Sequence, residues 1–238
     1  MNIAIIGYGK MGKEIEKVLI ERNHNIVLTI NENNLDEFNE QNLKEADIAI
    51  EFTTPENAVS NFKLCFNAGL PVVSGTTGWL DKFDEISELC KKNEYSFFYA
   101  SNFSLGVNIL FEINNQLSVL MNKFSGYNLE IDEIHHLQKK DSPSGTAIKL
   151  ANDIINNIER KSEWVNNIDA KEEQIKINSY REDKITGIHT IKYESDVDII
   201  KLKHSAKSRK GFAVGAVLAA EFLIGKKGVY SMKDLLNL

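Results

Sequence analysis

Cysteine and long apolar runs are both scarce in this chain of 238 residues. The two cysteines, Cys65 and Cys90, lie in helical patterns without a nearby His or Cys cluster. They therefore predict neither a disulfide framework nor a zinc site, and we expect buried, reduced thiols and no metal. No apolar run is long enough to span a bilayer, and the apolar N-terminus meets glycine too early for a signal peptide. We expect a cytoplasmic protein with no membrane partner.

Positive charge is not in excess either. The formal net charge is −6 and the pI is about 5.5, which argues against nucleic acid as a partner. The sequence has no repeats, no low-complexity segment and no Pro- or Ser-rich linker. With 42% hydrophobic residues it can bury the core of one large domain or of two smaller ones.

Strand-like and helix-like patterns alternate in the first hundred residues. Short apolar runs predict five strands, at residues 2–6, 25–30, 47–52, 70–74 and 95–99. Apolar residues at helical spacing predict helices between several of them, at residues 11–21, 55–68 and 81–92. The acidic stretch at 33–45 is typical of a polar helix or loop. This alternation predicts an α/β fold with a doubly wound parallel sheet.

The order of elements changes near Phe103, where we place a crossover into a second α/β domain. The patterns there predict helices at 107–121 and 146–159 and a strand at 128–135. Three strand-like runs follow without intervening helices, at 175–180, 188–194 and 197–204. The last two are expected to pair antiparallel around Ser195 and Asp196, which predicts a mixed sheet. An Ala- and Val-rich helix at 211–225 follows.

A glycine motif lies between the first strand and the first helix. Gly7 allows a tight turn, Gly9 allows close approach of a pyrophosphate, and Gly12 allows the helix to lie close to the sheet. This context favours dinucleotide binding over a mere tight turn. The candidate cofactor-binding residues are Gly7, Tyr8, Gly9, Lys10, Met11 and Gly12.

The end of the second strand departs from the usual nucleotide-binding pattern. An acid that accepts hydrogen bonds from the adenine ribose is expected there, but the sequence has Asn31 followed by Glu32. Asn31 replaces this acid, or Glu32 supplies it. An uncharged Asn31 repels a 2′-phosphate less than an aspartate would, yet no arginine adjoins these residues to bind that phosphate. The balance favours NADH slightly, with NADPH expected to work as well.

The stretch most indicative of a functional site is residues 133–146. It joins a strand pattern to a helical pattern. His135, His136 and Lys139 lie beside the expected helix N-terminus, where backbone N–H groups and a partial positive charge attract anions. These side chains can bind carboxylates or phosphates, and they can also transfer protons. A substrate-binding and proton-transfer site is therefore expected here.

This stretch resembles the E-x-H-H-x-x-K-x-D-x-P-S-G-T signature of the dihydrodipicolinate reductase family, whose members are 4-hydroxy-tetrahydrodipicolinate reductases. Three other segments carry the same resemblance in the expected order, at residues 7–12, 51–55 with 75–78, and 100–108. The resemblance implies hydride transfer from NADH or NADPH to an unsaturated cyclic dicarboxylate in the diaminopimelate and lysine pathway. It implies a Rossmann domain at 1–103 to which residues 211–238 return, a substrate-binding and oligomerisation domain at 104–210, and a homotetramer.

The resemblance also implies residue roles. His135 and Lys139 become the catalytic acid–base pair, with Lys139 the stronger candidate for proton donor. The substrate carboxylates are expected to bind His136, Ser144, Gly145 and Thr146. Two loops are expected to line the nicotinamide half of the cofactor, through Gly75, Thr76, Thr77, Ala100, Ser101, Asn102 and Phe103.

The two adjacent histidines pose a geometric question. If the strand runs through both, His135 and His136 face opposite sides of the sheet. Either the strand ends before them, or His136 contributes mostly through its backbone or from another direction. His24 and His189 are expected to make ordinary structural hydrogen bonds, and the loop at 204–209 is expected to be solvated.

Two other functions remain as alternatives. One is another Rossmann dehydrogenase of amino-acid metabolism, such as an aspartate or homoserine-type dehydrogenase, which explains the 133–146 stretch poorly. The other is a dinucleotide-binding sensor without catalytic activity. The presence of both His135 and Lys139 argues against a sensor.

Overall fold

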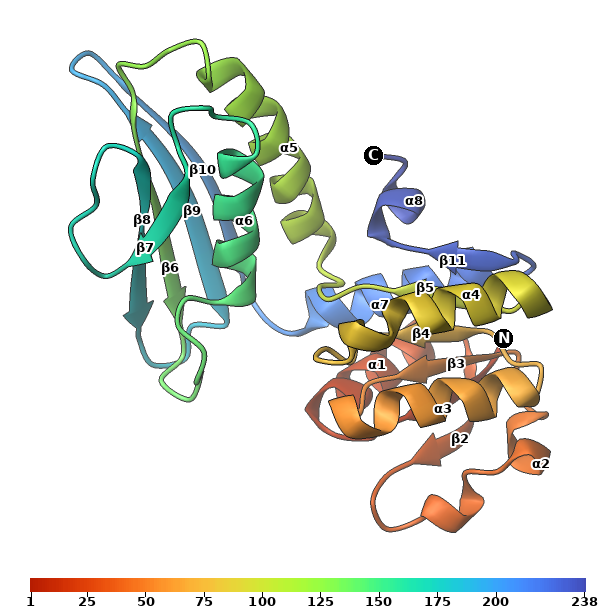
Figure 1. Ribbon diagram of the computed structural model, residues 1–238. Coiled ribbons are helices and arrows are strands. Elements are labelled where there is room, and N and C mark those ends of the chain that lie inside the picture. The colour runs from red at the N-terminus through yellow and green to blue at the C-terminus, as the bar shows by residue number, and fades with distance from the viewer. The chain divides into compact units, whose positions relative to one another are not determined.

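The computed structural model describes residues 1–238, and the chain forms two compact units (Figure 1). Unit 1 comprises Met1–Leu105 and Arg209–Leu238, and unit 2 comprises Gly106–Ser208. None of the helices is both long enough and apolar enough to span a membrane. Cys65 and Cys90 are free and buried, as expected, and burial raises the pKa of each thiol to about 12.

Unit 1 is built on a six-stranded parallel sheet in the order β11-β5-β4-β3-β1-β2. The chain moves outward from β1 to β2 and then returns to the other side of β1 with β3. Ligands of open α/β sheets bind beyond the carboxyl ends of the strands at such a reversal. The strands are β1 (Asn2–Ile6), β2 (Asn25–Ile30), β3 (Ile48–Glu51), β4 (Val72–Ser74), β5 (Ser96–Tyr99) and β11 (Gly228–Tyr230).

Helices cover both faces of this sheet, which explains why its central strands are apolar on both sides. One apolar cluster joins the sheet to α1 (Lys10–Glu21) and α7 (Lys210–Leu223), and the other joins it to α3 (Pro55–Asn67) and α4 (Phe83–Asn93) (Figure 1). The remaining short helices are η1 (Leu35–Glu37), α2 (Glu40–Leu43), η2 (Leu80–Lys82) and α8 (Met232–Leu236).

The return of α7 to unit 1 depends on its small residues. A Cβ at Gly215 would lie 1.8 Å from the backbone oxygen of Phe103, so only glycine permits this approach. Ala213, Ala216 and Ala220 are also fully buried on this helix. Their small size lets α7 pack close to the sheet and to α1.

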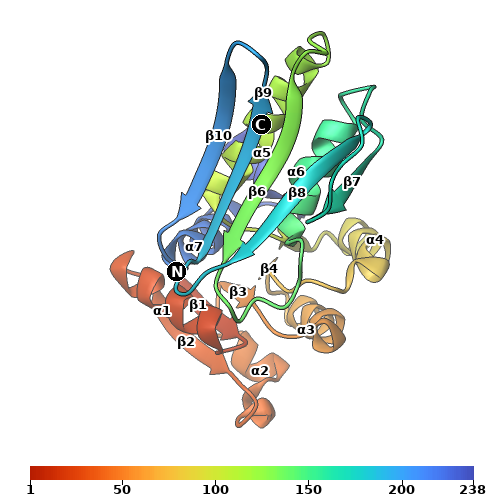
Figure 2. The same ribbon diagram turned by 90° about the vertical axis from the view of Figure 1, so that its left-hand side faces the viewer.

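Unit 2 contains a five-stranded mixed sheet in the order β10-β9-β6-β8-β7. The β6–β8 and β7–β8 pairs are parallel, whereas β6–β9 and β9–β10 are antiparallel. Two helices pack on one face of the sheet, and Figure 2 looks onto the opposite, open face. The elements are α5 (Leu105–Met121), β6 (Asn128–His135), α6 (Gly145–Ile155), β7 (Glu163–Asn166), β8 (Gln174–Arg181), β9 (Gly187–Glu194) and β10 (Ile199–Ala206).

The sequence of β6 determines which side chains meet the helices. Buried and partly exposed residues alternate along this strand, so Leu129, Ile131, Glu133 and His135 share the covered face. Side chains two positions apart lie on the same side of a strand. The apolar pair anchors the strand in the core, and the polar pair follows at its carboxyl end.

The predicted α/β class and mixed second sheet are confirmed, with three local differences. The strands β7 and β11 were not predicted, because each is short and lacks clear alternation. The helix predicted at 146–159 ends at Ile155, where two asparagines of low helix propensity follow. The helix predicted at 81–92 is divided into η2 and α4.

Candidate active site

The candidate site in unit 2 lies where β6 ends and α6 begins. Strand β6 includes His135 and ends there. Ser144 is the N-cap of α6, and its Oγ accepts a hydrogen bond from the backbone N–H of Ala147 at 3.2 Å. Gly145 and Thr146 begin the helix. The start of a helix carries a partial positive charge, so this turn is suited to an anion.

Glu133 connects the strand to this turn, although the sequence analysis gave it no role. Its carboxylate is fully buried and accepts the backbone N–H of Ser144, at 3.0 Å on one oxygen and 3.1 Å on the other. The Arg181 guanidinium at the end of β8 lies 3.5 Å away. A buried carboxylate requires partners of this kind. Glu133 thereby holds the N-terminus of α6 against β6.

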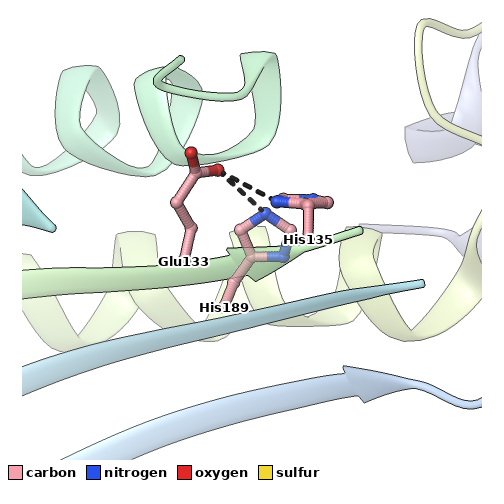
Figure 3. Close-up of side chains that lie close together, drawn as sticks. All are labelled: Glu133, His135 and His189. Atoms are coloured by element: carbon pink, nitrogen blue, oxygen red, sulfur yellow. Dashed lines mark ion pairs between the residues drawn. The ribbon is translucent and has the colours of Figure 1, made fainter. Parts of the chain in front are cut away.

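Two buried histidines face the same carboxylate oxygen (Figure 3). His135 Nδ1 lies 3.4 Å from Glu133 Oε2, and His189 Nε2 lies 3.9 Å from it. His189 Nε2 is also 3.2 Å from Ser144 Oγ. His189 comes from β9, where it is the cross-strand partner of Glu133. The expected hydrogen bonding of His189 is therefore present, but it occurs inside the candidate site.

Burial determines the protonation state of the His135 and His189 imidazole rings. Desolvation lowers the pKa of His135 to about 4, and the nearby charge of Glu133 only partly opposes this effect. Desolvation also lowers the pKa of His189 to about 3. Both imidazoles are therefore neutral near pH 7, and each has one N–H donor and one acceptor nitrogen.

Lys139 lies in the turn between β6 and α6. Its ammonium donates hydrogen bonds to both carboxylate oxygens of Asp141, at 2.8 and 2.9 Å. Burial would raise the pKa of Asp141, but the hydrogen bond and charge of Lys139 lower it overall. The backbone oxygen of Asp141 accepts from Arg181 at 2.6 Å. Arg181 thus anchors the segment that carries the lysine.

The structure answers the question about the adjacent histidines. Because β6 ends at His135, His136 is the first residue of the following turn. Its backbone oxygen accepts the N–H of Lys139 at 3.0 Å, and its ring Nδ1 is buried without a partner. His136 does not belong to the cluster of Glu133, His135 and His189.

These three side chains also have the spacing of a metal site, since their ligand atoms lie within 4.8 Å of one another. Both oxygens of the Glu133 carboxylate already accept a hydrogen bond from the Ser144 N–H, so they are not free to bind a metal ion. The guanidinium of Arg181 and the helix N-terminus add positive charge. The surroundings favour an anionic ligand over a cation.

The glycine motif of unit 1 has the tight geometry of a nucleotide-binding turn. Gly7 has a φ of +96°, and a Cβ there would lie 2.1 Å from the Phe52 backbone oxygen. A Cβ at Gly12 would lie 2.4 Å from the oxygen of Gly7. Gly9, in contrast, has no atom within 4 Å of its Cβ position. Tyr8, Lys10 and Met11 complete the turn and the start of α1. This open space around Gly9 is compatible with the close approach of a phosphate that such a motif requires.

A second buried carboxylate organises the loops beyond β3 and β4. Glu51 accepts hydrogen bonds from Ser74 Oγ at 2.7 Å and from Thr76 Oγ1 at 2.9 Å. The hydroxyl and backbone N–H of Thr53 also donate to it. Burial raises the pKa of Glu51, and these hydrogen bonds oppose the shift. The network holds Thr76 in place, next to Gly75 and the exposed Thr77.

The turn after β2 is built by asparagines. Asn31 Oδ1 accepts the N–H of Asn33, and the Asn31 N–H donates to Asn34 Oδ1, both at 2.8 Å. The Asn31 oxygen is thus engaged within the turn, whereas Glu32 is exposed. Glu32 is the carboxylate available beyond the end of this strand.

The segment after β5 contains the last group of candidate residues, Ala100, Ser101, Asn102 and Phe103. The side chain of Phe103 is buried and packs against the rings of Phe52 and Phe98. Asn102 Oδ1 accepts the backbone N–H of Ser104 at 2.9 Å. Ser101 is exposed and Ala100 is buried. Phe103 is therefore a core residue, and its backbone oxygen lies against Gly215.

Sequence reasoning missed Glu133, His189 and Arg181 as parts of the site. Glu133 gave a signal, because it shares the strand face of His135 at a spacing of two. His189 and Arg181 are distant in sequence and come into place only through pairing of β6 with β9 and β8. Strand pairing of this kind cannot be obtained from a local motif.

Two family models match nearly the whole chain. The one described as "Dihydrodipicolinate reductase, N-terminus" matches residues 1–103, and the one described as "Dihydrodipicolinate reductase, C-terminus" matches residues 106–236. A 4-hydroxy-tetrahydrodipicolinate reductase of Christiangramia forsetii is 48% identical over 237 residues, covering 100% of this chain and 98% of the relative. One from Thermosipho africanus is 34% identical over 239 residues, with coverage of 100% and 98%.

Solved structures show the same fold. A dipicolinate-bound dihydrodipicolinate reductase from Paenisporosarcina sp. TG-14 has a TM-score of 0.80 at 23% identity, covering 97% of each chain. An aspartate semialdehyde dehydrogenase from Vibrio cholerae has a TM-score of 0.53 at 13% identity, covering 94% of this chain and 98% of that one. The family models and the relatives of full length identify this chain as a member of the dihydrodipicolinate reductase family.

Proposed function

We propose that this chain reduces 4-hydroxy-tetrahydrodipicolinate to tetrahydrodipicolinate in diaminopimelate and lysine biosynthesis, with NADH or NADPH as hydride donor and with loss of the 4-hydroxyl group as water. The observation that carries the proposal is the single strand–turn–helix segment that presents His135, Lys139 and the Ser144 N-cap. An ammonium, a neutral imidazole and a helix N-terminus provide what a cyclic dicarboxylate needs for binding and protonation.

In unit 2, the substrate carboxylates are held by the start of α6. Ser144, Gly145 and Thr146 supply a hydroxyl group and the first turn of the helix, and His136 binds from the preceding turn. A hydrogen bond to a charged group contributes about 1.5–3 kcal/mol. Two carboxylates on one ring also fix its orientation, which is required for hydride transfer to a defined carbon.

Proton transfer is assigned to Lys139 and His135. Lys139 is charged and carries three donor hydrogens, so it donates the proton to the reduced substrate. The neutral ring of His135 holds or relays a proton within the same segment. Asp141 keeps the lysine side chain in the turn until substrate carboxylates compete for the ammonium.

In unit 1, the residues around the glycine motif fit a nicotinamide nucleotide, which supplies the hydride when it is bound. The open space at Gly9 admits a pyrophosphate to the N-terminus of α1. The loops held by Glu51, together with residues 100–103, line the nicotinamide half. Glu32 accepts the ribose hydroxyls and repels a 2′-phosphate, which favours NADH somewhat over NADPH.

The open face of the mixed sheet is the proposed oligomer interface. It carries paired charges, such as Lys192 with Glu130 at 3.0 Å, and it has no helix over it (Figure 2). Packing of such faces against one another gives a homotetramer. Light scattering or native mass measurement tests this, and a monomer at working concentration would exclude it. Because the reaction draws on reduced nicotinamide nucleotides and biosynthetic intermediates, we place the enzyme in the cytoplasm.

The proposed reaction is tested by following nucleotide oxidation at 340 nm. Substrate is generated in situ from pyruvate and aspartate semialdehyde by a dihydrodipicolinate synthase, and the purified chain is added with NADH or NADPH. We expect oxidation that depends on the synthase, faster with NADH. Binding of NADH without oxidation would reject the reductase assignment and favour a nucleotide-binding sensor.

A further inference from the structure

We propose that Glu133 is a positioning residue that determines which ring nitrogen of His135 carries the proton and that fixes the anion-binding turn at the same time. The proposal deepens the proposed function, on which it rests for the identity of the reaction. No other described carboxylate contacts both His135 and the start of α6.

The first contact of the Glu133 carboxylate is with the anion-binding turn at the start of α6. Both of its oxygens accept the N–H of Ser144, the residue whose hydroxyl group caps α6. Arg181 lies 3.5 Å from the Oε1 atom and also binds the backbone of Asp141. The carboxylate therefore sets the position of α6 relative to the turn that carries Lys139.

The second neighbour of the Glu133 carboxylate is the imidazole ring of His135. Its Nδ1 atom is buried, has no hydrogen-bond partner, and lies 3.4 Å from Glu133 Oε2. A neutral imidazole has one N–H group, and a neighbouring carboxylate favours the proton on the facing nitrogen. His135 thus carries its proton on Nδ1 and leaves Nε2 as the nitrogen that accepts a proton.

The surroundings of Nε2 support this assignment. Gly187 on β9 lies beside it, and a Cβ there would be 3.1 Å from Nε2 and 3.3 Å from Cδ2. The glycine leaves space next to this nitrogen, where an alanine would press against the ring. The Nδ1 atom therefore lies beside the Glu133 carboxylate, and the Nε2 atom lies beside Gly187, which has no side chain.

A Glu133→Gln substitution gives a sharp prediction because Arg181 lies beside Oε1 only, whereas both oxygens accept the Ser144 N–H. The Oε1 position is next to Arg181 and Ser144 N–H, both donors, so the amide oxygen takes that position. The amide NH₂ then faces His135 Nδ1. An NH₂ group needs an acceptor, so the proton of His135 moves to Nε2.

The experiment is ¹⁵N NMR of the histidine rings in the full chain, labelled on histidine, without substrate at pH 7. We expect His135, assigned by its loss in His135→Asn, to be protonated on Nδ1 in the wild type and on Nε2 in Glu133→Gln. Steady-state kinetics should show kcat reduced by about 10²–10⁴-fold, as a misplaced tautomer does in other enzymes, with the KM for NADH unchanged.

Asp132→Asn is the matched control. It removes a carboxylate from the neighbouring position on the other face of β6, where Asp132 accepts from Asn178 at 2.9 Å. This variant should retain the wild-type tautomer. An Nε2-protonated His135 in the wild type would overturn the proposal, even if Glu133→Gln does not fold. An unchanged tautomer in a folded Glu133→Gln protein would do the same. Because the tautomer is read without substrate, a wrong reaction assignment does not affect this result.

Discussion

The rings of His135 and His189 pack edge to face, with centroids 5.0 Å apart and planes at 68° (Figure 3). They come from neighbouring strands and share one carboxylate oxygen of Glu133. Protonation of either ring would place a charge in a buried position beside the other. The pair is therefore neutral in the folded protein at neutral pH, and this property has consequences for stability.

Acid should destabilise the fold through His189. Its pKa falls from 6.5 in the unfolded chain to about 3 in the folded protein because of burial. Below pH 6.5 the unfolded chain binds a proton that the folded protein does not, so stability present above this pH is lost as the pH falls toward 3. The loss is about 1.4 kcal/mol per pH unit within this window. Urea unfolding between pH 7.5 and 4.5 measures it.

His189→Gln provides the comparison, because glutamine can still bond to Ser144 but does not titrate. Its unfolding free energy should depend less steeply on pH than that of the wild type by about one proton. His24→Gln, which removes a histidine from unit 1, is the control. Parallel pH profiles for the wild type and His189→Gln would show that His189 is not held neutral.

Lys139→Ala should abolish most turnover and leave nucleotide binding intact. The substitution removes the proposed proton donor, and general acid catalysis contributes about 10²–10⁴-fold. The Kd for NADH, measured by fluorescence, should remain near the wild-type value because Lys139 belongs to unit 2. The control is Lys140→Ala, which removes the adjacent, exposed ammonium. Equal turnover rates for Lys139→Ala and Lys140→Ala would show that Lys139 is not the proton donor.

Ser144→Ala should affect both stability and substrate binding. Loss of the N-cap costs about 1 kcal/mol of stability. Loss of the hydroxyl group proposed to bind a substrate carboxylate should also raise the substrate KM by about 10–100-fold. Ser231→Ala removes a comparable cap, that of α8 in unit 1. It should cost similar stability with an unchanged KM, and a rise in KM for both variants would indicate a general effect of stability.

The glycine motif allows two substitutions, of which one should destabilise the fold and the other should not. Gly12→Ala places a Cβ 2.4 Å from the Gly7 backbone oxygen and should lower the thermal midpoint. Gly9→Ala meets no atom within 4 Å and should leave the midpoint unchanged. Because Gly9 is the proposed point of approach for the pyrophosphate, this variant should nevertheless bind NADH more weakly. Full NADH affinity in Gly9→Ala would place the nucleotide elsewhere.

The sequence predicted much of unit 1 because its elements depend on local patterns. The strand at 25–30 matches β2 in full, and the helix predicted at 55–68 matches α3 to within one residue. In unit 2 the antiparallel pair around Ser195 and Asp196 is confirmed as β9 and β10. The strand predicted at 175–180 is confirmed as β8, but its parallel pairing with β6 was not predicted, because local patterns do not give the order of strands in a sheet.

Some residues of the candidate site could be predicted from the local sequence, whereas others are brought there by strand pairing. His135, Lys139 and Ser144 were predicted because one strand–turn–helix segment carries all three. The cap formed by Ser144 follows from its residue type and its place before a helical pattern. His189 and Arg181 reach Glu133 only through the register of three strands, which residue spacing does not encode.

The central claim is that a hydride passes from nicotinamide to a cyclic dicarboxylate on this protein. The most direct measurement uses NADH carrying two deuterium atoms at C4, with substrate generated by the synthase in ordinary water. Mass spectrometry of the product should find one deuterium atom per molecule, because one hydride comes from NADH and the added proton comes from ordinary water through Lys139. A product without deuterium from labelled NADH would contradict the account.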